Sequence, residues 1–276
     1  LSRDLNVYLD GGSVPYKTPA LLPEVMKDPD IRTLTVAEAE YIEPQIVMER
    51  ITSIMSREKY ADWSKFQEAQ KRPVKKDYDT YFAEENAERE KWLKQLGTSA
   101  ARLPNDVISW TIKAQAQCMA EDFAGCQTSA DRALALQAGN MQAMLRKGEA
   151  LLGLSKTAPE AERKALAKDA RKWLLEANAA SPNAHEPLLL YYESFAAEGR
   201  KAPQEAIDAL AQVVDTIPQI SRPRLSLGRE LIARGQYALA KKRLTPLAFA
   251  PHESVDQATA KAMLDSIPAE GAGAGS

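Results

Sequence analysis

The residues best suited to acid–base or metal chemistry are scarce, since the 276-residue chain holds two His and two Cys. His185-Glu186 and His252-Glu253 each begin like the His-Glu-x-x-His helix that binds zinc in metallopeptidases, but neither has the second His. Both pairs are better explained as helix starts, where the Glu suits the positive end of the helix dipole. We therefore predict no catalytic residue, no metal site and no cofactor.

The two cysteines, Cys118 and Cys126, flank a predicted turn between two helices. Two interpretations stay open from the sequence: a pair of small buried core residues, or a disulfide, which would matter only in an oxidising compartment. A metal site is disfavoured because no His or third Cys lies nearby.

Composition excludes several classes of partner. The chain carries 36 basic and 38 acidic residues, a net charge of −2, and no basic stripe, which disfavours nucleic acid and anionic membranes. No apolar run reaches the roughly 18–20 residues that a membrane span needs, so no membrane insertion is expected. The start, Leu-Ser-Arg-Asp, is neither a signal peptide nor an initiator Met, and we expect a processed product or a fragment.

A repeated register from Val107 to about Ser254 predicts the elements that carry these residues. Four units are expected at 107–140, 141–184, 185–220 and 221–254, the second having extra residues near 155–162. We number the positions of each unit as slots, counted from its first residue. Two antiparallel helices cross at slots 8 and 20, so small side chains are expected there. Slot 8 holds Ala114, Gly148, Tyr192 and Gly228, and slot 20 holds Cys126, Ala170, Ala206 and Ala240.

The flanking regions differ from the repeats. Closely spaced prolines make 1–34 irregular, and we predict a helical region over 35–106, starting at Thr35 with Glu38 three residues later as a capping box. Helices are expected near 58–70 and 77–102, and helical spacing of apolar residues extends to Ile54. A capping helix, 253–267, would cover the end of the stack, and 268–276 reads as a disordered tail.

Further slots strengthen the pattern. Slot 4 has large apolar residues at Trp110, Met144 and Leu188, and slot 24 has Leu174, Leu210 and Leu244. This period and these slots resemble the tetratricopeptide repeat, although Tyr192 at slot 8 and Arg224 at slot 4 depart from it. The resemblance implies an all-α fold, an α-solenoid wound as a right-handed superhelix, and a protein-binding rather than a catalytic role.

A second resemblance concerns the order of segments. The stretches at 7–16 (Val-Tyr-Leu-Asp-Gly-Gly…Val-Pro-Tyr), 32–39, 186–195 and 247–252 are similar to the C-terminal half of bacterial proteins that join a zinc-peptidase-like domain to tetratricopeptide repeats. That resemblance implies that residues 1 to about 30 end a missing upstream domain, with this chain as its accessory half. A periplasmic or secreted location would then be favoured over a cytoplasmic one.

The tetratricopeptide resemblance also implies a binding groove, lined by the first helix of each unit at slots 2, 5, 9, 12 and 13. We expect the mostly apolar residues of slots 5 and 12 to form an exposed floor, with an acidic middle and a basic end, covered by a partner or by the N-terminal region. We predict a non-catalytic scaffold that binds a protein or peptide segment there, or alternatively a self-associating structural subunit. Partner identity and oligomeric state stay open. The candidate groove residues are Thr111, Gln115, Leu145, Glu149, Leu189, Glu193, Arg222, Leu225 and Arg229.

Two expectations concern individual side chains. Trp110 and Trp173 are predicted to be buried core anchors. Lys164, Lys168 and Arg171 are predicted to lie on the solvated side of a long helix.

Overall fold

The structure is a computed structural model that describes residues 33–40, 42, 46, 54–251 and 253–268. Contacts divide the chain into two units, 1–35 and 36–276. The described part of the first unit, residues 33–35, has no regular secondary structure, and everything below concerns the second unit. The expectations for residues 1 to about 30, for His252 and for most of the 268–276 tail fall outside the described residues.

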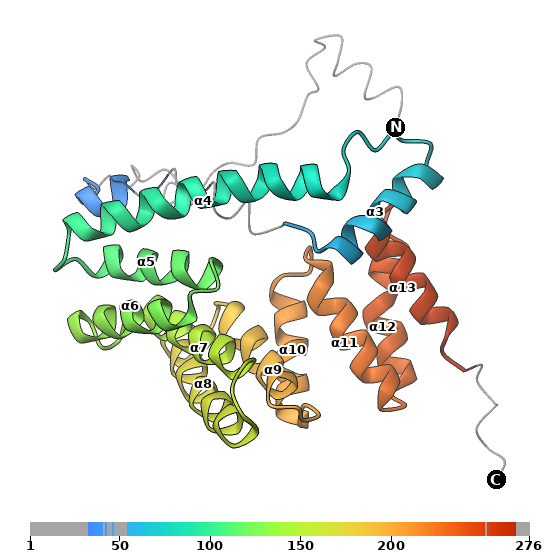
Figure 1. Ribbon diagram of the computed structural model, residues 1–276. Helices are drawn as coiled ribbons and strands as arrows, with labels where there is room; N and C mark the ends of the chain where they lie inside the picture. Colours follow the sequence, from blue (N-terminus) through green and yellow to red (C-terminus); the bar gives the residue numbers. More distant parts are fainter. Residues whose placement is uncertain (1–32, 41, 43–45, 47–53, 252, 269–276) are drawn as a thin grey trace, which may run out of the picture. The chain divides into compact units, whose positions relative to one another are not determined.

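The second unit is built of antiparallel helix pairs, each packed on the next (Figure 1). Each of the four predicted ranges holds one pair, and a further helix, α13 (Val255–Asp265), packs on the last pair. The pairs are α5 (Val107–Met119) with α6 (Phe123–Leu136), α7 (Met141–Ser155) with α8 (Glu160–Ala180), α9 (Glu186–Ala197) with α10 (Gln204–Thr216), and α11 (Ser221–Ala233) with α12 (Tyr237–Ala248).

Small residues stand where the helices of a pair cross, with Tyr192 at slot 8 of the third pair as the exception. A Cβ atom placed on Gly148 would lie 2.7 Å from Cδ2 of Leu174, and one on Gly228 would lie 2.5 Å from Cδ2 of Leu244. The slot-8 glycines thus make room for the slot-24 leucines of the partner helix. Every slot-20 residue is fully buried at 0% exposure: Cys126, Ala170, Ala206 and Ala240. Close helix approach buries these apolar side chains and stabilises each pair.

Local signals set the helix ends. Asp106, Asp122 and Asn140 cap α5, α6 and α7, each side chain accepting a hydrogen bond from the backbone N–H three residues on. Gly199 and Gly235, both at slot 15, end their turns with φ of 79° and 70°, which glycine adopts without steric cost. Glycine at slot 15 therefore indicates the end of the first helix, a signal that our sequence analysis did not use.

The extra residues of the second unit mostly lengthen a helix. The expected insertion near 155–162 is a short turn followed by the first residues of α8, which runs for 21 residues against 14 in α6. The additional residues at the start of α8 are rich in charge: Glu160, Glu162 and Lys164 are exposed, and Arg163 is partly buried.

The N-terminal helical region packs against the first pair. Here α4 (Tyr78–Arg102) lies on α5, with the fully buried Leu96 contacting a cluster that includes Ile112, Ala116 and Ala37 (Figure 1). The preceding helix, α3 (Arg57–Ala69), meets α4 through stacked aromatic rings, Tyr60 lying 4.9 Å from Tyr81 between ring centroids. The residues from 36 onward therefore share one compact unit with the repeats.

Several single-residue expectations for these helices fail. Helix is present at 36–40, as the capping box at Thr35 predicts, but Ile54 is outside any helix. Trp110 and Trp173 are only half-buried, whereas Trp92 on α4 is buried. Trp92 lies on α4, outside the range that the repeat register covers.

Arg224 takes the place of an aromatic residue at slot 4 by bonding the backbone. The residue is 9% exposed, and its guanidinium donates to the carbonyl oxygens of Arg243 and Pro218, at 3.0 and 3.2 Å. Burial, with the nearby Arg243 charge, lowers its pKa below the usual value. The hydrogen bonds satisfy donors that would otherwise be buried without partners.

Over the part of the chain that the structure describes, no helix combines the length and the apolar character that a membrane span requires.

Candidate functional site

The predicted groove residues lie on the first helices of the four pairs, α5, α7, α9 and α11. Helix α5 packs on α7, and α7 packs on α9, while polar contacts link α9 to α11. The side chains at slots 2 and 9 of these helices stay at least partly exposed, and we call this surface the first-helix face. At slot 9 they are Gln115, Glu149, Glu193 and Arg229, and at slot 2 they are Ile108, Gln142, Glu186 and Arg222.

The expectation of an exposed apolar floor is wrong at slot 5. Leu145 is 0% exposed and Leu225 is 5% exposed, and Thr111 is also buried. Leu145 packs in one core cluster with Leu174, and Leu225 packs in another with Leu244. Slot 5 is thus enclosed by the second helix of its own pair. Of the predicted leucines only Leu189 keeps some exposure, and the first-helix face is mainly polar.

Ion pairs neutralise much of the charge on this face. Glu193 of α9 and Arg222 of α11 approach to 2.7 Å between Oε1 and Nη2, so two predicted groove residues contact each other directly. Glu149 pairs within α7 with Arg146, at 2.5 Å. The acidic middle that the sequence predicts is therefore largely compensated by adjacent guanidinium groups.

A further polar contact joins α9 to α11 beside this face. The hydroxyl of Tyr192, at slot 8, donates to Oε1 of Glu230 at 3.0 Å. Burial, followed by the Glu230 charge, raises the pKa of Tyr192 to about 12, so the phenol keeps its proton at neutral pH. Tyr192 thus replaces the small residue expected at slot 8 with a hydrogen bond to the next unit.

A pocket of about 210 Å³ opens on the first-helix face between α5 and α7. Its walls combine apolar side chains with amide groups that can both donate and accept hydrogen bonds. Such a surface suits a peptide backbone better than a charged small molecule. The lining residues are Ile108, Thr111, Ile112, Gln115, Asn140 and Gln142.

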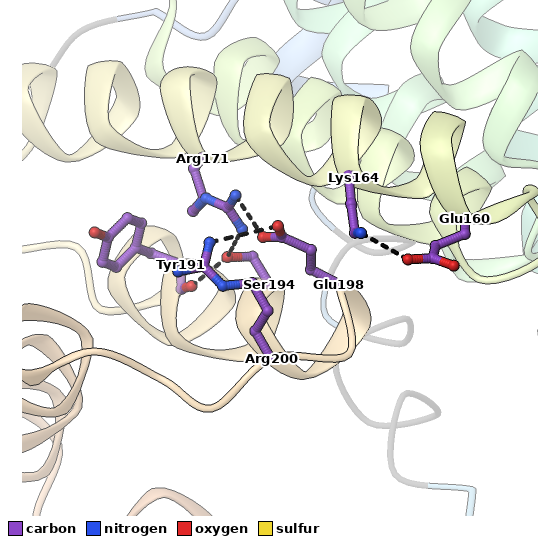
Figure 2. Close-up of polar contacts among 7 residues, drawn as sticks. All are labelled: Glu160, Lys164, Arg171, Tyr191, Ser194, Glu198 and Arg200. Carbon is purple, nitrogen blue, oxygen red and sulfur yellow. Dashed lines mark hydrogen bonds and ion pairs between the residues drawn. The ribbon is translucent and has the colours of Figure 1, made fainter.

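A second polar cluster ties the second pair to the third (Figure 2). Arg171 of α8 approaches Glu198, just after α9, to 2.7 Å, and Glu198 also pairs with Arg200 at 3.4 Å. Arg171 lies 4.6 Å above the ring of Phe195 and donates to Ser194 at 3.4 Å. The expectation that Arg171 faces solvent is wrong, since its side chain is 13% exposed: α9 covers this part of α8.

We expect Glu198→Gln to lower the free energy of unfolding by about 1–3 kcal/mol, because it leaves the largely buried Arg171 charge without its carboxylate. Chemical denaturation measures the change. The matched control is Glu160→Gln in the same view (Figure 2), whose carboxylate pairs with Lys164 at 2.6 Å but is 76% exposed. We expect no measurable change there. Equal effects of the two substitutions would contradict a structural role for the Glu198 cluster.

The two cysteines form a disulfide between α5 and α6. Their Cα atoms lie 5.2 Å apart, and both side chains are buried, Cys118 at 4% and Cys126 at 0% exposure. Both sequence interpretations thus hold in part: the residues are core residues, and they are bonded.

Of the two histidines, only His185 lies within the described residues. His185 stands at the start of α9, as predicted, with Nδ1 3.8 Å from a carboxylate oxygen of Glu186. Among the described residues, no three His, Cys, Asp or Glu side chains gather closely enough to hold a metal ion.

Stacked antiparallel pairs, small residues at the helix crossings and a polar face on the first helices define a tetratricopeptide-repeat fold, an all-α solenoid. Solved structures agree. A thermophilic tetratricopeptide-repeat protein of Thermus thermophilus has 16% sequence identity and a TM-score of 0.53, with 64% of this chain and 91% of that chain covered.

Two other solved structures match with lower TM-scores. A double mutant of MamA RS-1 has 20% identity and a TM-score of 0.46, covering 64% of this chain and 88% of its own. MamA from residue 41 onward, of Desulfovibrio magneticus RS-1, has 22% identity and a TM-score of 0.44, covering 58% and 84%. No protein-family model and no curated protein matches the sequence. The zinc-peptidase-like resemblance stays a prediction.

Proposed function

We propose that this chain is a non-catalytic scaffold that binds a protein segment along the first-helix face. The observation that carries the proposal is the exposure pattern. At slots 2 and 9 the side chains of four successive first helices stay at least partly exposed, whereas slots 20 and 24 are buried and slot 5 is buried except at Leu189. A row of open positions on a rigid helical stack can present hydrogen-bonding groups to an extended segment over several units.

The composition of the face supports a peptide as the bound species. Amide side chains predominate near α5 and α7, where the pocket of about 210 Å³ lies. Leu189, farther along on α9, offers an apolar contact. A mixture of amides and one partly exposed leucine suits hydrogen bonding to a peptide backbone with anchoring of single side chains.

The disulfide supports an oxidising compartment as the place of action. A disulfide persists in the periplasm or outside the cell, whereas cytosolic reductants keep most thiols reduced. This favours the periplasmic or secreted location over a cytoplasmic one.

The proposal predicts that Gln115→Lys combined with Glu149→Lys abolishes capture of the partner. The two added charges alter neighbouring slot-9 positions without touching the core. Tagged protein would be used for capture from cells that produce it, with quantitative mass spectrometry of the retained proteins. We expect a loss of at least about tenfold, because the lysine side chains remove the amide and carboxylate acceptors of slot 9 and bring ammonium groups that docking would have to desolvate.

The matched control is Gln127→Lys combined with Glu176→Lys, on the second helices α6 and α8 at positions of similar partial exposure. It introduces the same charges in the same two units, away from the first-helix face. Circular dichroism first establishes that both variants fold. Partners retained equally by all three proteins would contradict binding at this face.

A further inference from the structure

A pocket of about 500 Å³ lies where the turn between α9 and α10 meets the end of α11. It adjoins the first-helix face, because Arg229 belongs to both. We call it the basic pocket, after the charges of its wall. It is lined by Lys201, Ala202, Arg229, Glu230, Ala233 and Arg234.

The wall of the basic pocket is held in place by its own contacts. Nη2 of Arg234 donates to the carbonyl oxygen of Ala202, and its Nε lies 3.5 Å from a carboxylate oxygen of Glu230. Ala202 is 7% exposed and packs in the core cluster that contains Phe195. The turn and the helix are thus fixed to each other, so the pocket exists before any ligand binds.

Glu230, the one acidic residue that lines the basic pocket, already has two polar partners. Glu230 accepts a hydrogen bond from the Tyr192 hydroxyl at 3.0 Å and pairs with Arg234. Lys201 and Arg229 are exposed, and within the described ranges neither has an ion-pair partner. Two uncompensated positive charges therefore border a preformed cavity.

The charges on the rest of the first-helix face make this pocket distinctive. Glu149 and Glu193 are each paired with an arginine, so neither is free to bind a cationic partner. The uncompensated cations at this end of the face are Lys201 and Arg229. A guanidinium and an ammonium together suit carboxylates, since Arg can bind one through two parallel hydrogen bonds.

We propose that the basic pocket binds the carboxylate side chains of an acidic stretch within the bound protein segment. This inference rests on the proposed function and adds the chemistry of the partner: Asp or Glu residues at one end of a segment that follows the first-helix face. The pocket sets the direction of the segment, because its acidic end must lie at α11.

Binding of a model peptide tests the proposal directly. The probe is Glu-Glu-Leu-Glu-Glu-Leu with an uncharged fluorophore, measured by fluorescence anisotropy with the full chain at low salt. The control probe replaces each Glu by Gln. We expect the Glu peptide to bind at least about tenfold more tightly, and to lose affinity in about 0.5 M salt, where screening is nearly complete.

Charge reversal locates the binding. Lys201→Glu with Arg229→Glu should weaken binding of the Glu peptide by at least about tenfold, and Arg132→Glu with Lys242→Glu should change it by less than about twofold. The control pair lies on second helices, α6 and α12, away from the pocket. Equal binding of the Glu and Gln peptides, or an equal effect of the two variants, would overturn the proposal. Competition by inorganic phosphate as strong as that by unlabelled peptide would also overturn it, by assigning the pocket to a small anion.

The two proposals fail separately. The variant Gln115→Lys/Glu149→Lys leaves the basic pocket intact. Failure of the peptide to bind, with partner capture still dependent on Gln115 and Glu149, refutes the acidic-segment proposal alone. Capture that does not depend on those residues refutes the proposed function, whatever the peptide does.

Discussion

Leu174→Ala is expected to lower the free energy of unfolding by about 2–5 kcal/mol, the range for deleting a fully buried leucine side chain. Leu174 is 0% exposed, lies against Gly148 of the partner helix and packs in the central core cluster of the second pair. Its removal leaves a cavity that the glycine cannot fill, because glycine has no side chain to move into it. Urea denaturation followed by circular dichroism measures the loss.

The adjacent residue supplies the control. Leu175 follows Leu174 on α8 but is 47% exposed. The same substitution, Leu175→Ala, should change stability by about 0.5 kcal/mol or less, as for most surface positions. Because residue type, helix and helix propensity are identical, the difference between the two variants isolates burial. Similar losses from both would mean that slot 24 does not face the core.

Removal of the disulfide with Cys118→Ala and Cys126→Ala is expected to cost about 2–3 kcal/mol, the loop-closure estimate for so short a loop. The bond joins α5 and α6 across a sequence separation of eight residues, inside a buried cluster with Ala114 and Ala130. It restricts the unfolded chain and fixes the first pair, which α4 covers on one side. Urea denaturation of the oxidised parent and the double variant measures the cost.

Reduction of the parent provides an independent check. Dithiothreitol should shift the denaturation midpoint of the parent towards that of the double variant, and should leave the variant unchanged. A parent protein whose midpoint does not respond to the reductant, with two titratable thiols after unfolding, would show that the cysteines are not bonded.

The helix pairs could be predicted from the sequence because their determinants are local and repeated. Gly148 and Gly228 stand at slot 8, and Leu174 and Leu244 stand at slot 24, so each glycine–leucine contact recurs within one unit. Such contacts join residues less than a repeat apart, and the same spacing recurs in successive units. The capping residues act over three positions and are equally readable.

The exposure of the candidate site could be predicted only in part, since it depends both on packing within a pair and on how one pair stacks on the next. The register identified Gln115, Glu149, Glu193 and Arg229 as one row. It also assigned Leu145 to an exposed floor, although the second helix of its own pair encloses it. Arg171 looked like a solvated helix residue, but the following unit covers it with Phe195 and Glu198.

The basic pocket escaped the sequence analysis altogether. Lys201 stands in a turn whose length departs from the repeat, and Arg234 lies beyond the slots that line a groove. The hydrogen bond from Arg234 to the Ala202 carbonyl joins wall residues 32 positions apart, and the one from Tyr192 to Glu230 holds a wall residue from 38 positions away. Such contacts cannot be predicted from the spacing of residues along the sequence.

The sequence by itself determined the all-α solenoid and the crossing points of its helices, because periodic small and apolar residues encode packing between near neighbours. Only the tertiary structure decided which members of each row remain open, that the cysteines are joined, and where positive charge stays uncompensated. Exposure and charge compensation arise from packing within each pair and from the stacking of successive units. The disulfide forms because α5 and α6 bring the two Cα atoms to 5.2 Å.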